Sequence, residues 1–154
     1  MNMLLKSFSV ALALSAVSLS VSADDLIATT AANKGGMNTV ALDLVTSGES
    51  VAFEFVVALP KGAANVDLSG CLKGIPSSHQ GKCVFNEKMN QVVAIAFSAT
   101  NAKLPSGGLS LGSVRYTSLQ KDGATATIQD LVVADGSGGA IQSEIRSENA
   151  LLGK

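Results

Sequence analysis

The chain has 154 residues, 47% of them hydrophobic, and a formal net charge of −1, which fits one globular domain. Its 11 basic residues form no cluster, so nucleic acid and anionic membrane surfaces are excluded as favoured partners. The composition includes no tryptophan and one tyrosine, which leaves too few aromatic side chains for the flat Trp and Tyr row common in sugar-binding modules.

The first 23 residues have the pattern of a secretory signal peptide. Met1–Lys6 carries one positive charge, Ser7–Leu19 is a short apolar run, and small residues precede a predicted cut after Ala23. We therefore expect a secreted or periplasmic protein. Residues 24–36 are interpreted as an N-terminal lead-in to the folded domain. No later segment approaches the ~20 apolar residues of a membrane helix, so no membrane span is expected in the mature chain.

Cys71 and Cys83 are the two cysteines of the chain. In an exported protein, a pair of cysteines favours a disulfide. Such a bond would close a loop of 13 residues and contribute about 3 kcal/mol by chain entropy. A zinc site would need more ligands of the right type than one histidine and two cysteines supply, so no metal or other cofactor is predicted.

Alternating apolar and polar residues predict strands in the first half of the domain. Met37–Val45 and Ser50–Leu59 alternate with period two, and the second places Phe53 and Phe55 on one face. A short turn containing glycine separates the two segments, so we expect an antiparallel hairpin that ends at Pro60.

The middle of the chain predicts a long loop followed by a second hairpin. Asn65–Leu68 is expected to be a short strand, and glycine, proline and serine make Leu72–Lys82 a loop. Cys83–Asn86 and Gln91–Ser98 are predicted to pair across a four-residue turn. Because Gln91–Ser98 has apolar residues on both faces, we expect it to be buried on both sides, with Phe97 in the core.

The remaining strands are predicted at Leu109–Ser118, Ala124–Ala134 and Ala140–Ile145, with residues 147–154 as a C-terminal tail. The total is about eight to nine short strands with turns at regular intervals and no alternating helices. This pattern predicts an all-β fold, an antiparallel jelly-roll or Greek-key sandwich over residues 37–146.

No combination of residues predicts catalysis. His79 has no recognisable nucleophile or orienting partner in the sequence, so it is expected to be an exposed loop residue. The glycines of Asp135–Gly139 are interpreted as a turn, because a serine-protease nucleophile segment needs the aspartate directly before the serine. Asp130 and Asp135 either accept hydrogen bonds in this turn or, with Asp122, contribute to a structural calcium site, and both interpretations stay open.

The loop between the cysteines is the predicted binding element, because a disulfide would restrict its freedom before a ligand binds. The alternative is that the bridge only stabilises a long connection. Tyr116 is the one side chain that could stack on a sugar from the surface, and its alternative interpretation is an ordinary strand residue. The candidate binding residues are Lys73, Ser77, Ser78, His79, Gln80, Lys82 and Tyr116.

Four segments together resemble the cohesin-like and bacterial carbohydrate-binding β-sandwich superfamily. They are Ser50–Leu59, Gln91–Ser98, Leu109–Tyr116 and the closing Leu131–Gly138 with its Asp-Gly turn. The resemblance implies a nine-stranded, jelly-roll-like sandwich with a binding role and no catalysis.

The preferred hypothesis is therefore an exported, non-catalytic β-sandwich with a binding or structural role in the bacterial envelope or outside the cell, and the sequence leaves open whether its ligand is a protein or a polysaccharide. The alternative is a module that binds a polysaccharide, and a small enzyme is the least favoured class. An exposed Tyr or Phe on one sheet would favour the sugar. A bare sheet edge would favour a protein that adds a strand. A polar pocket with His79 and a carboxylate would favour an enzyme.

Overall fold

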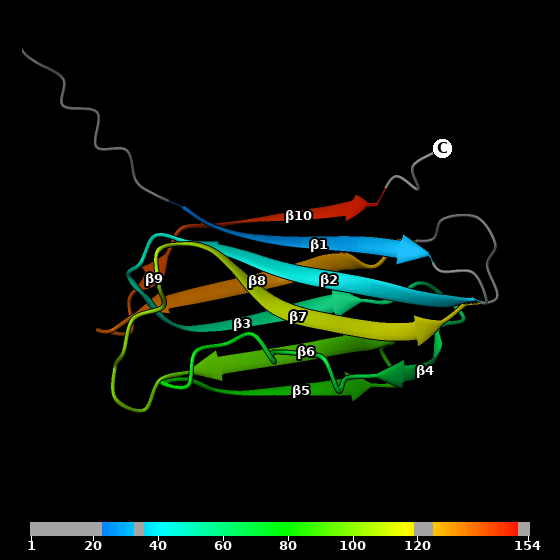
Figure 1. Ribbon diagram of the computed structural model, residues 1–154, viewed down its shortest axis with the longest axis horizontal. Coiled ribbons are helices and arrows are strands. Elements are labelled where there is room, and N and C mark those ends of the chain that lie inside the picture. Colours follow the sequence, from blue (N-terminus) through cyan, green and yellow to red (C-terminus); the bar gives the residue numbers. More distant parts are fainter. Residues whose placement is uncertain (1–22, 33–35, 119–124, 151–154) are drawn as a thin grey trace, which may run out of the picture.

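The computed structural model describes residues 23–32, 36–118 and 125–150, which form two packed β-sheets (Figure 1). The strands are β1 (Asp24–Ala32), β2 (Met37–Thr46), β3 (Ser50–Ala58), β4 (Ala64–Asp67), β5 (Gln80–Asn86), β6 (Gln91–Phe97), β7 (Gly107–Thr117), β8 (Thr127–Asp135), β9 (Ala140–Ile141) and β10 (Ser143–Asn149).

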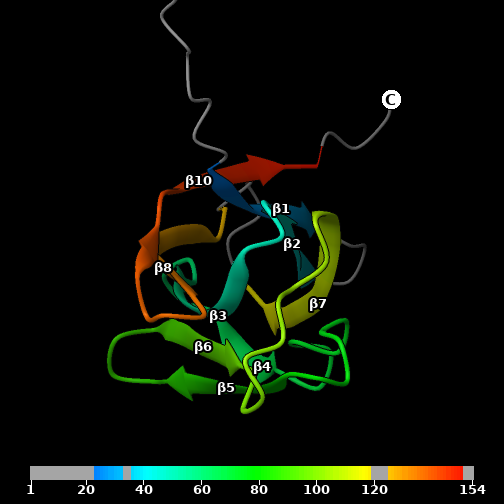
Figure 2. The same cartoon turned by 90° about the vertical axis from the view of Figure 1, so that its left-hand side faces the viewer.

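Each sheet has five strands. Sheet A has the order β10-β1-β2-β7-β4, and sheet B has the order β5-β6-β3-β8-β9. Figure 2 looks along the strands and shows the two sheets as separate layers. Every strand pair is antiparallel except β1 and β10, which run parallel. The all-β sandwich is thus confirmed, while the expectation of a purely antiparallel one is wrong at this pair.

The core forms because every second residue of the central strands faces the opposite sheet. On β3, Phe53, Phe55 and Val57 are buried, and Leu42 and Leu44 of β2 are buried in the same cluster. The rings of Phe53 and Phe55 stack with centroids 6.0 Å apart, which confirms that they share one face. Burying an aliphatic or aromatic side chain of this size contributes roughly 1.5–3 kcal/mol, so this face of β3 is a main source of stability.

The predicted hairpin between the first two segments is wrong, because β2 belongs to sheet A and β3 to sheet B. Residues 47–49 carry the chain from one layer to the other, with Gly48 at a φ of 85°. The buried carboxylate of Asp24 accepts hydrogen bonds from the Ser47 amide and the Ser50 hydroxyl at this corner. Two strands with one apolar face each gain more by facing one another across the core than by lying side by side.

The predicted domain limits also differ from the structure. The expected lead-in contains β1, whose Leu26 and Ala28 are fully buried, and the expected tail contains the second half of β10. These two strands pair with each other, and Arg146 of β10 forms an ion pair with Asp25 of β1. β1 was missed and β10 was predicted only as far as Ile145, because each of the two strands depends on the other end of the chain for its partner.

The disulfide between Cys71 and Cys83 is confirmed, with the two Cα atoms 6.4 Å apart. It ties the connection after β4 to the edge strand β5. The same connection hydrogen-bonds to the edge of β7, where the Gly74 amide donates to the Leu111 carbonyl. Gly74 is required there, because a Cβ atom would lie 1.8 Å from the Ser110 carbonyl oxygen.

The predicted signal peptide lies outside the described residues, apart from Ala23. Within the described ranges, no helix is long and apolar enough to cross a membrane.

Candidate functional site

The outer face of sheet B is the candidate site, because large apolar side chains from three of its strands, β5, β6 and β8, are exposed on it. Strand register places the outward side chains in rows across the sheet. Each row is read from β5 through β6 and β3 to β8. The first row is Gln80, Phe97, Ala52 and Ala134, and the second is Lys82, Ile95, Glu54 and Val132. The third row is Val84, Val93, Val56 and Asp130. Ile95 and Phe97 are each 44% exposed, Val84 is 49% exposed and Val132 is 53% exposed.

The exposure of β6 corrects the sequence-based expectation that this strand is buried on both sides. Its inward residues Val92, Ala94 and Ala96 are fully buried, but Ile95 and Phe97 face solvent. No third layer covers sheet B in the part of the chain that the structure describes. The apolar residues on the second face of β6 therefore belong to the surface.

A shallow hollow of about 270 Å³ lies at one end of this face. Ile95 and Phe97 line it on one side, Val132 and Ala134 on the other, and Glu54 lies between them. The small side chains of Ala52 and Ala134 leave the space open. Pockets that enclose drug-sized ligands have roughly 300–1,000 Å³, so this hollow has the size for one long side chain.

Glu54 is the charged residue at the centre of this face. The ion pairs found among the described residues join Lys103 to Glu49, Arg115 to Asp67 and Arg146 to Asp25, so Glu54 takes part in none of them. Lys82 is in the same row but Ile95 lies between them, which separates the two backbones by about 10 Å. The Glu54 carboxylate is therefore an unpaired negative charge among apolar side chains.

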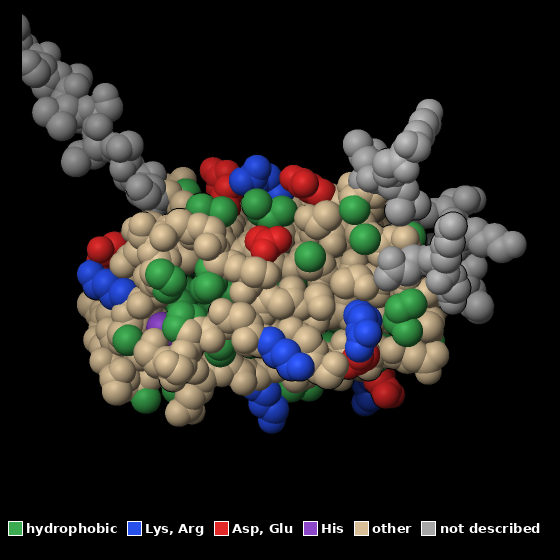
Figure 3. Space-filling view, in the orientation of Figure 1, with side chains coloured by type: hydrophobic (Ala, Val, Ile, Leu, Met, Phe, Trp, Pro, Cys, Tyr) green, Lys and Arg blue, Asp and Glu red, His purple; other side chains and the backbone are tan. Residues whose placement is uncertain are grey.

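The outer face of sheet A is different in chemistry. In the view of Figure 3, most of the surface over β1, β2 and β7 is tan, the colour of backbone and of side chains that are neither hydrophobic nor charged, with scattered hydrophobic side chains. One row across it is Thr29, Ala41 and Ser113. Beside it, hydrogen bonds from Ser69 and from Arg115 lower the pKa of Asp67 to about 2. The Asp67 carboxylate thus already has partners, unlike that of Glu54.

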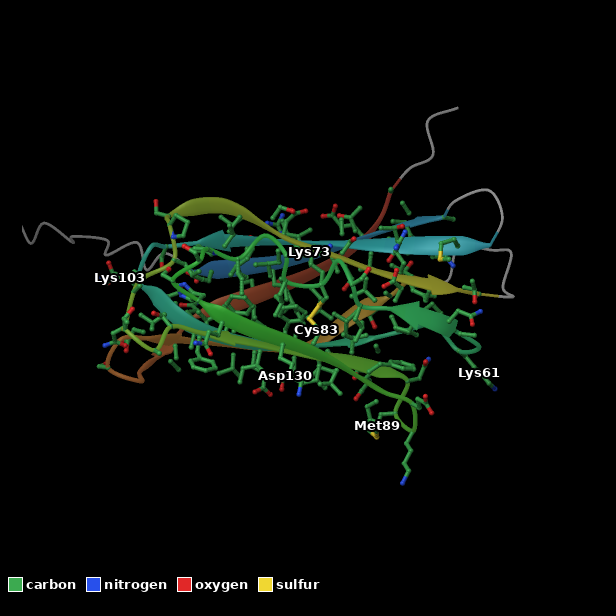
Figure 4. All side chains as sticks on the ribbon, turned by 60° about the horizontal axis from the view of Figure 1, so that its bottom comes forward. Lys61, Lys73, Cys83, Met89, Lys103 and Asp130 are labelled. Atoms are coloured by element: carbon green, nitrogen blue, oxygen red, sulfur yellow. A yellow bond between two sulfur atoms is a disulfide. The ribbon has the colours of Figure 1, made fainter. Side chains whose placement is uncertain are left out.

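The predicted binding residues are not gathered into one loop site. Lys73, Ser77 and Ser78 lie exposed in the connection before β5, while Gln80 and Lys82 lie on β5 beside Phe97 and Ile95. In Figure 4, Lys73 and Asp130 lie on opposite sides of the disulfide at Cys83. Gln80 and Lys82 therefore border the outer face of sheet B, whereas Lys73 is remote from it.

His79 is buried, with 6% of its surface exposed, so its expected place on an exposed loop is wrong. The chain turns inward there, where the His79 amide donates to the Pro76 carbonyl. The ring Nδ1 lies 3.0 Å from the Ser78 hydroxyl, and Nε2 has no hydrogen-bond partner among the described residues. Burial lowers the pKa of His79 below 6.5. The imidazole is therefore shielded from solvent, next to the Ser78 hydroxyl.

Tyr116 is fully buried, so its place among the candidate binding residues is wrong, and its alternative interpretation as a residue of a strand is confirmed. It lies on β7, two residues after the buried Val114, and its ring belongs to the core. Burial raises the pKa of its hydroxyl above 10.

The turn after β8 supports the hydrogen-bonding interpretation of Asp135. One oxygen of its carboxylate accepts hydrogen bonds from the Ser137 amide, the Ser137 hydroxyl and the Gly139 amide. These bonds, led by that of the Ser137 side chain, lower the pKa of Asp135. Among the described residues, no three His, Cys, Asp or Glu side chains are grouped as a metal site would require. Asp122 lies outside the described residues.

No protein-family model matches the chain, and no curated protein matches it. Solved structures do match it. A non-cellulosomal cohesin from Archaeoglobus fulgidus has a TM-score of 0.62 at 15% identity, over 82% of this chain and 88% of that one. A type II cohesin module from a scaffoldin of Acetivibrio cellulolyticus has a TM-score of 0.60 at 12% identity, over 84% and 96%. The fold is cohesin-like.

A third match is a Clostridium thermocellum structure of a type I cohesin–dockerin complex, with a TM-score of 0.58 at 12% identity, over 83% of this chain and 95% of that one. The cohesin-like fold confirms the resemblance seen in the sequence. At such identities the likeness concerns the fold.

The residues that sequence reasoning missed are Glu54, Ile95, Phe97 and Val132. A signal for them was present in the second predicted hairpin. Its register pairs Ile95 with Lys82, and a lysine is rarely buried without a partner. Extending this pairing through the hairpin would have placed Ile95 and Phe97 on the solvent side.

Proposed function

We propose that this chain is a non-catalytic docking module that binds a folded protein on the outer face of sheet B. The observation that carries the proposal is the group of exposed apolar side chains on three strands of sheet B, β5, β6 and β8: Val84, Ile95, Phe97 and Val132. Contiguous apolar patches on soluble domains mark interaction sites, because covering them removes apolar surface from water.

The chemistry of the face supports a protein as the occupant. Aliphatic side chains predominate, and a polar border is formed by Gln80, Lys82 and Asp130. An apolar centre with a polar rim is the usual arrangement of protein–protein interfaces. The cohesin–dockerin complex among the structural matches supports the same class of function for this fold.

The place of action proposed here is outside the cytoplasm. The disulfide supports it, since such bonds persist in oxidising compartments. The signal-peptide pattern of residues 1–23 supports it independently.

A photo-cross-linking experiment tests the proposal. A photoreactive amino acid is placed at Val132 or Ile95, and as controls at Thr29 or Ala41 on the outer face of sheet A, in the organism that makes the protein. We expect one protein to be captured from the sheet B positions and not from the controls. The purified partner should bind the parent and Ala41→Asp alike, and Ile95→Asp at least tenfold more weakly. Capture from the sheet A positions alone would contradict the proposal.

One observation favours polysaccharide binding as a second candidate. Phe97 is an exposed aromatic side chain on the outer face of sheet B, and a sugar ring can stack on such a ring. Affinity electrophoresis against soluble polysaccharides distinguishes the two candidates. Retardation that is lost in Phe97→Ala but kept in Ile95→Asp would favour the sugar.

A further inference from the structure

We propose that the hollow at Glu54 receives a basic side chain, most suitably an arginine, from the protein that docks on the outer face of sheet B. This inference rests on the proposed function and specifies the chemistry of the partner.

The geometry provides a floor and two walls for one extended side chain. Ile95 and Val132 lie on either side of Glu54 in the same row, while Phe97 and Ala134 flank Ala52 in the next. The apolar walls fit the methylene groups of a long side chain, and the carboxylate lies at the centre. Arginine and lysine have this combination of an apolar stem and a charged head.

The electrostatics require a positive charge in the occupant. Glu54 has no ion pair among the described residues, and it would lose water when a partner covers its apolar neighbours. Burying a carboxylate without a partner is costly. A purely apolar or acidic side chain in the hollow would leave the desolvation cost of the Glu54 carboxylate uncompensated, whereas a cation hydrogen-bonded to Glu54 offsets it.

Phe97 favours arginine over lysine. Its exposed ring forms one wall of the hollow. A guanidinium is planar, stacks on aromatic rings and can donate two parallel hydrogen bonds to a carboxylate. The ammonium of a lysine would bind the carboxylate as a point charge and would stack less well on the Phe97 ring.

Probe binding to the purified protein tests this inference without knowledge of the partner. The probes are N-acetyl-arginine amide and the uncharged analogue N-acetyl-citrulline amide, followed by the methyl NMR signals of Ile95 and Val132. The variants are Glu54→Gln and the matched control Glu87→Gln, which removes the same charge in the turn at the other end of the β5–β6 hairpin.

We expect the arginine amide to shift both methyl signals saturably in the parent and in Glu87→Gln. Binding should weaken at least about fivefold in Glu54→Gln, and citrulline amide should bind at least about fivefold more weakly than arginine amide. Equal binding of the two amides, or shifts that survive Glu54→Gln, would overturn the inference.

The cross-linked partner separates this inference from the proposed function. Its affinity should fall roughly tenfold or more in Glu54→Gln and rise with decreasing salt, because a charge pair is screened by ions. A partner that cross-links to Val132 but binds Glu54→Gln normally overturns the basic side chain and leaves the docking face intact. Cross-linking confined to sheet A overturns the docking face itself.

Discussion

Phe53 and Glu54 are neighbours on β3, but their side chains face opposite sides of sheet B. Phe53 is 2% exposed and stacks on Phe55, whereas Glu54 lies in the surface hollow. One residue along the strand therefore separates a group that stabilises the fold from one that is available to a partner.

Phe53→Ala should lower the free energy of unfolding by about 3–5 kcal/mol, because it leaves a cavity beside Phe55. Glu54→Ala should change it by less than about 0.5 kcal/mol, since the carboxylate has no ion pair among the described residues to lose. Chemical denaturation of the two variants measures both values. Equal losses would mean that the assigned faces of β3 are wrong.

His79 gives the protein a pH dependence in the neutral range. Burial lowers its pKa below 6.5, so the unfolded chain binds the proton more readily than the folded one. The free energy of unfolding should therefore fall as the pH drops through 6.5 and continue to fall until the folded-state pKa is reached.

The variant His79→Phe should show a flatter profile between pH 7.5 and 5.5, because His79 is the one histidine of the chain. Thermal unfolding at several pH values measures the two slopes. Parallel profiles for parent and variant would assign the pH dependence to another group.

The connection from β4 to β5 is the element with the most covalent and steric constraint. The disulfide joins it to β5, and Gly70 and Gly74 hydrogen-bond to the edge of β7. It packs under Gly81 of β5, where a Cβ would lie 2.8 Å from the side chains of Leu72 and Ile75. The connection therefore closes one open side of the sandwich.

Replacing both cysteines by serine should lower the free energy of unfolding by about 3 kcal/mol, the value expected for a loop of this size. The β signal in circular dichroism should remain, because the disulfide adds no strand pairing of its own. Denaturation of the double variant, compared with the parent in the absence of reductant, measures the loss. A change below about 1 kcal/mol would mean that loop packing replaces the bond.

At the scale of the whole molecule, the two ends of the folded domain close the opposite side of the sandwich. β10 pairs with β1 of sheet A and also contacts β8 of sheet B. The Ser147 hydroxyl accepts a hydrogen bond from the Ile128 amide, and Ser143 donates one to the Leu131 carbonyl. β10 therefore links the layers as well as extending one of them.

Truncation after Gln142 should lower the melting temperature by at least about 5 °C, which corresponds to roughly 1 kcal/mol in a domain of this size. The exposed edge of β1 should also increase self-association, since unpaired strand edges accept further strands. Scanning calorimetry and light scattering of the truncated chain measure the two effects. An unchanged melting temperature would show that β10 is dispensable.

Local patterns in the sequence were sufficient for the strands from β2 to β8, the Cys71–Cys83 bond and the inward face of β3. The strands and the inward face of β3 follow from alternation with period two, and the disulfide follows from the oxidising compartment that the signal-peptide pattern implies. Both signals can be recognised without knowing which segments are neighbours in space. The tertiary structure alone decided the pairing of β1 with β10, the separation of β2 from β3, and the burial of His79 and Tyr116. It also decided that Ile95 and Phe97 face solvent. The physical reason is that alternation identifies the two faces of a strand, whereas only distant segments determine which of two apolar faces is covered.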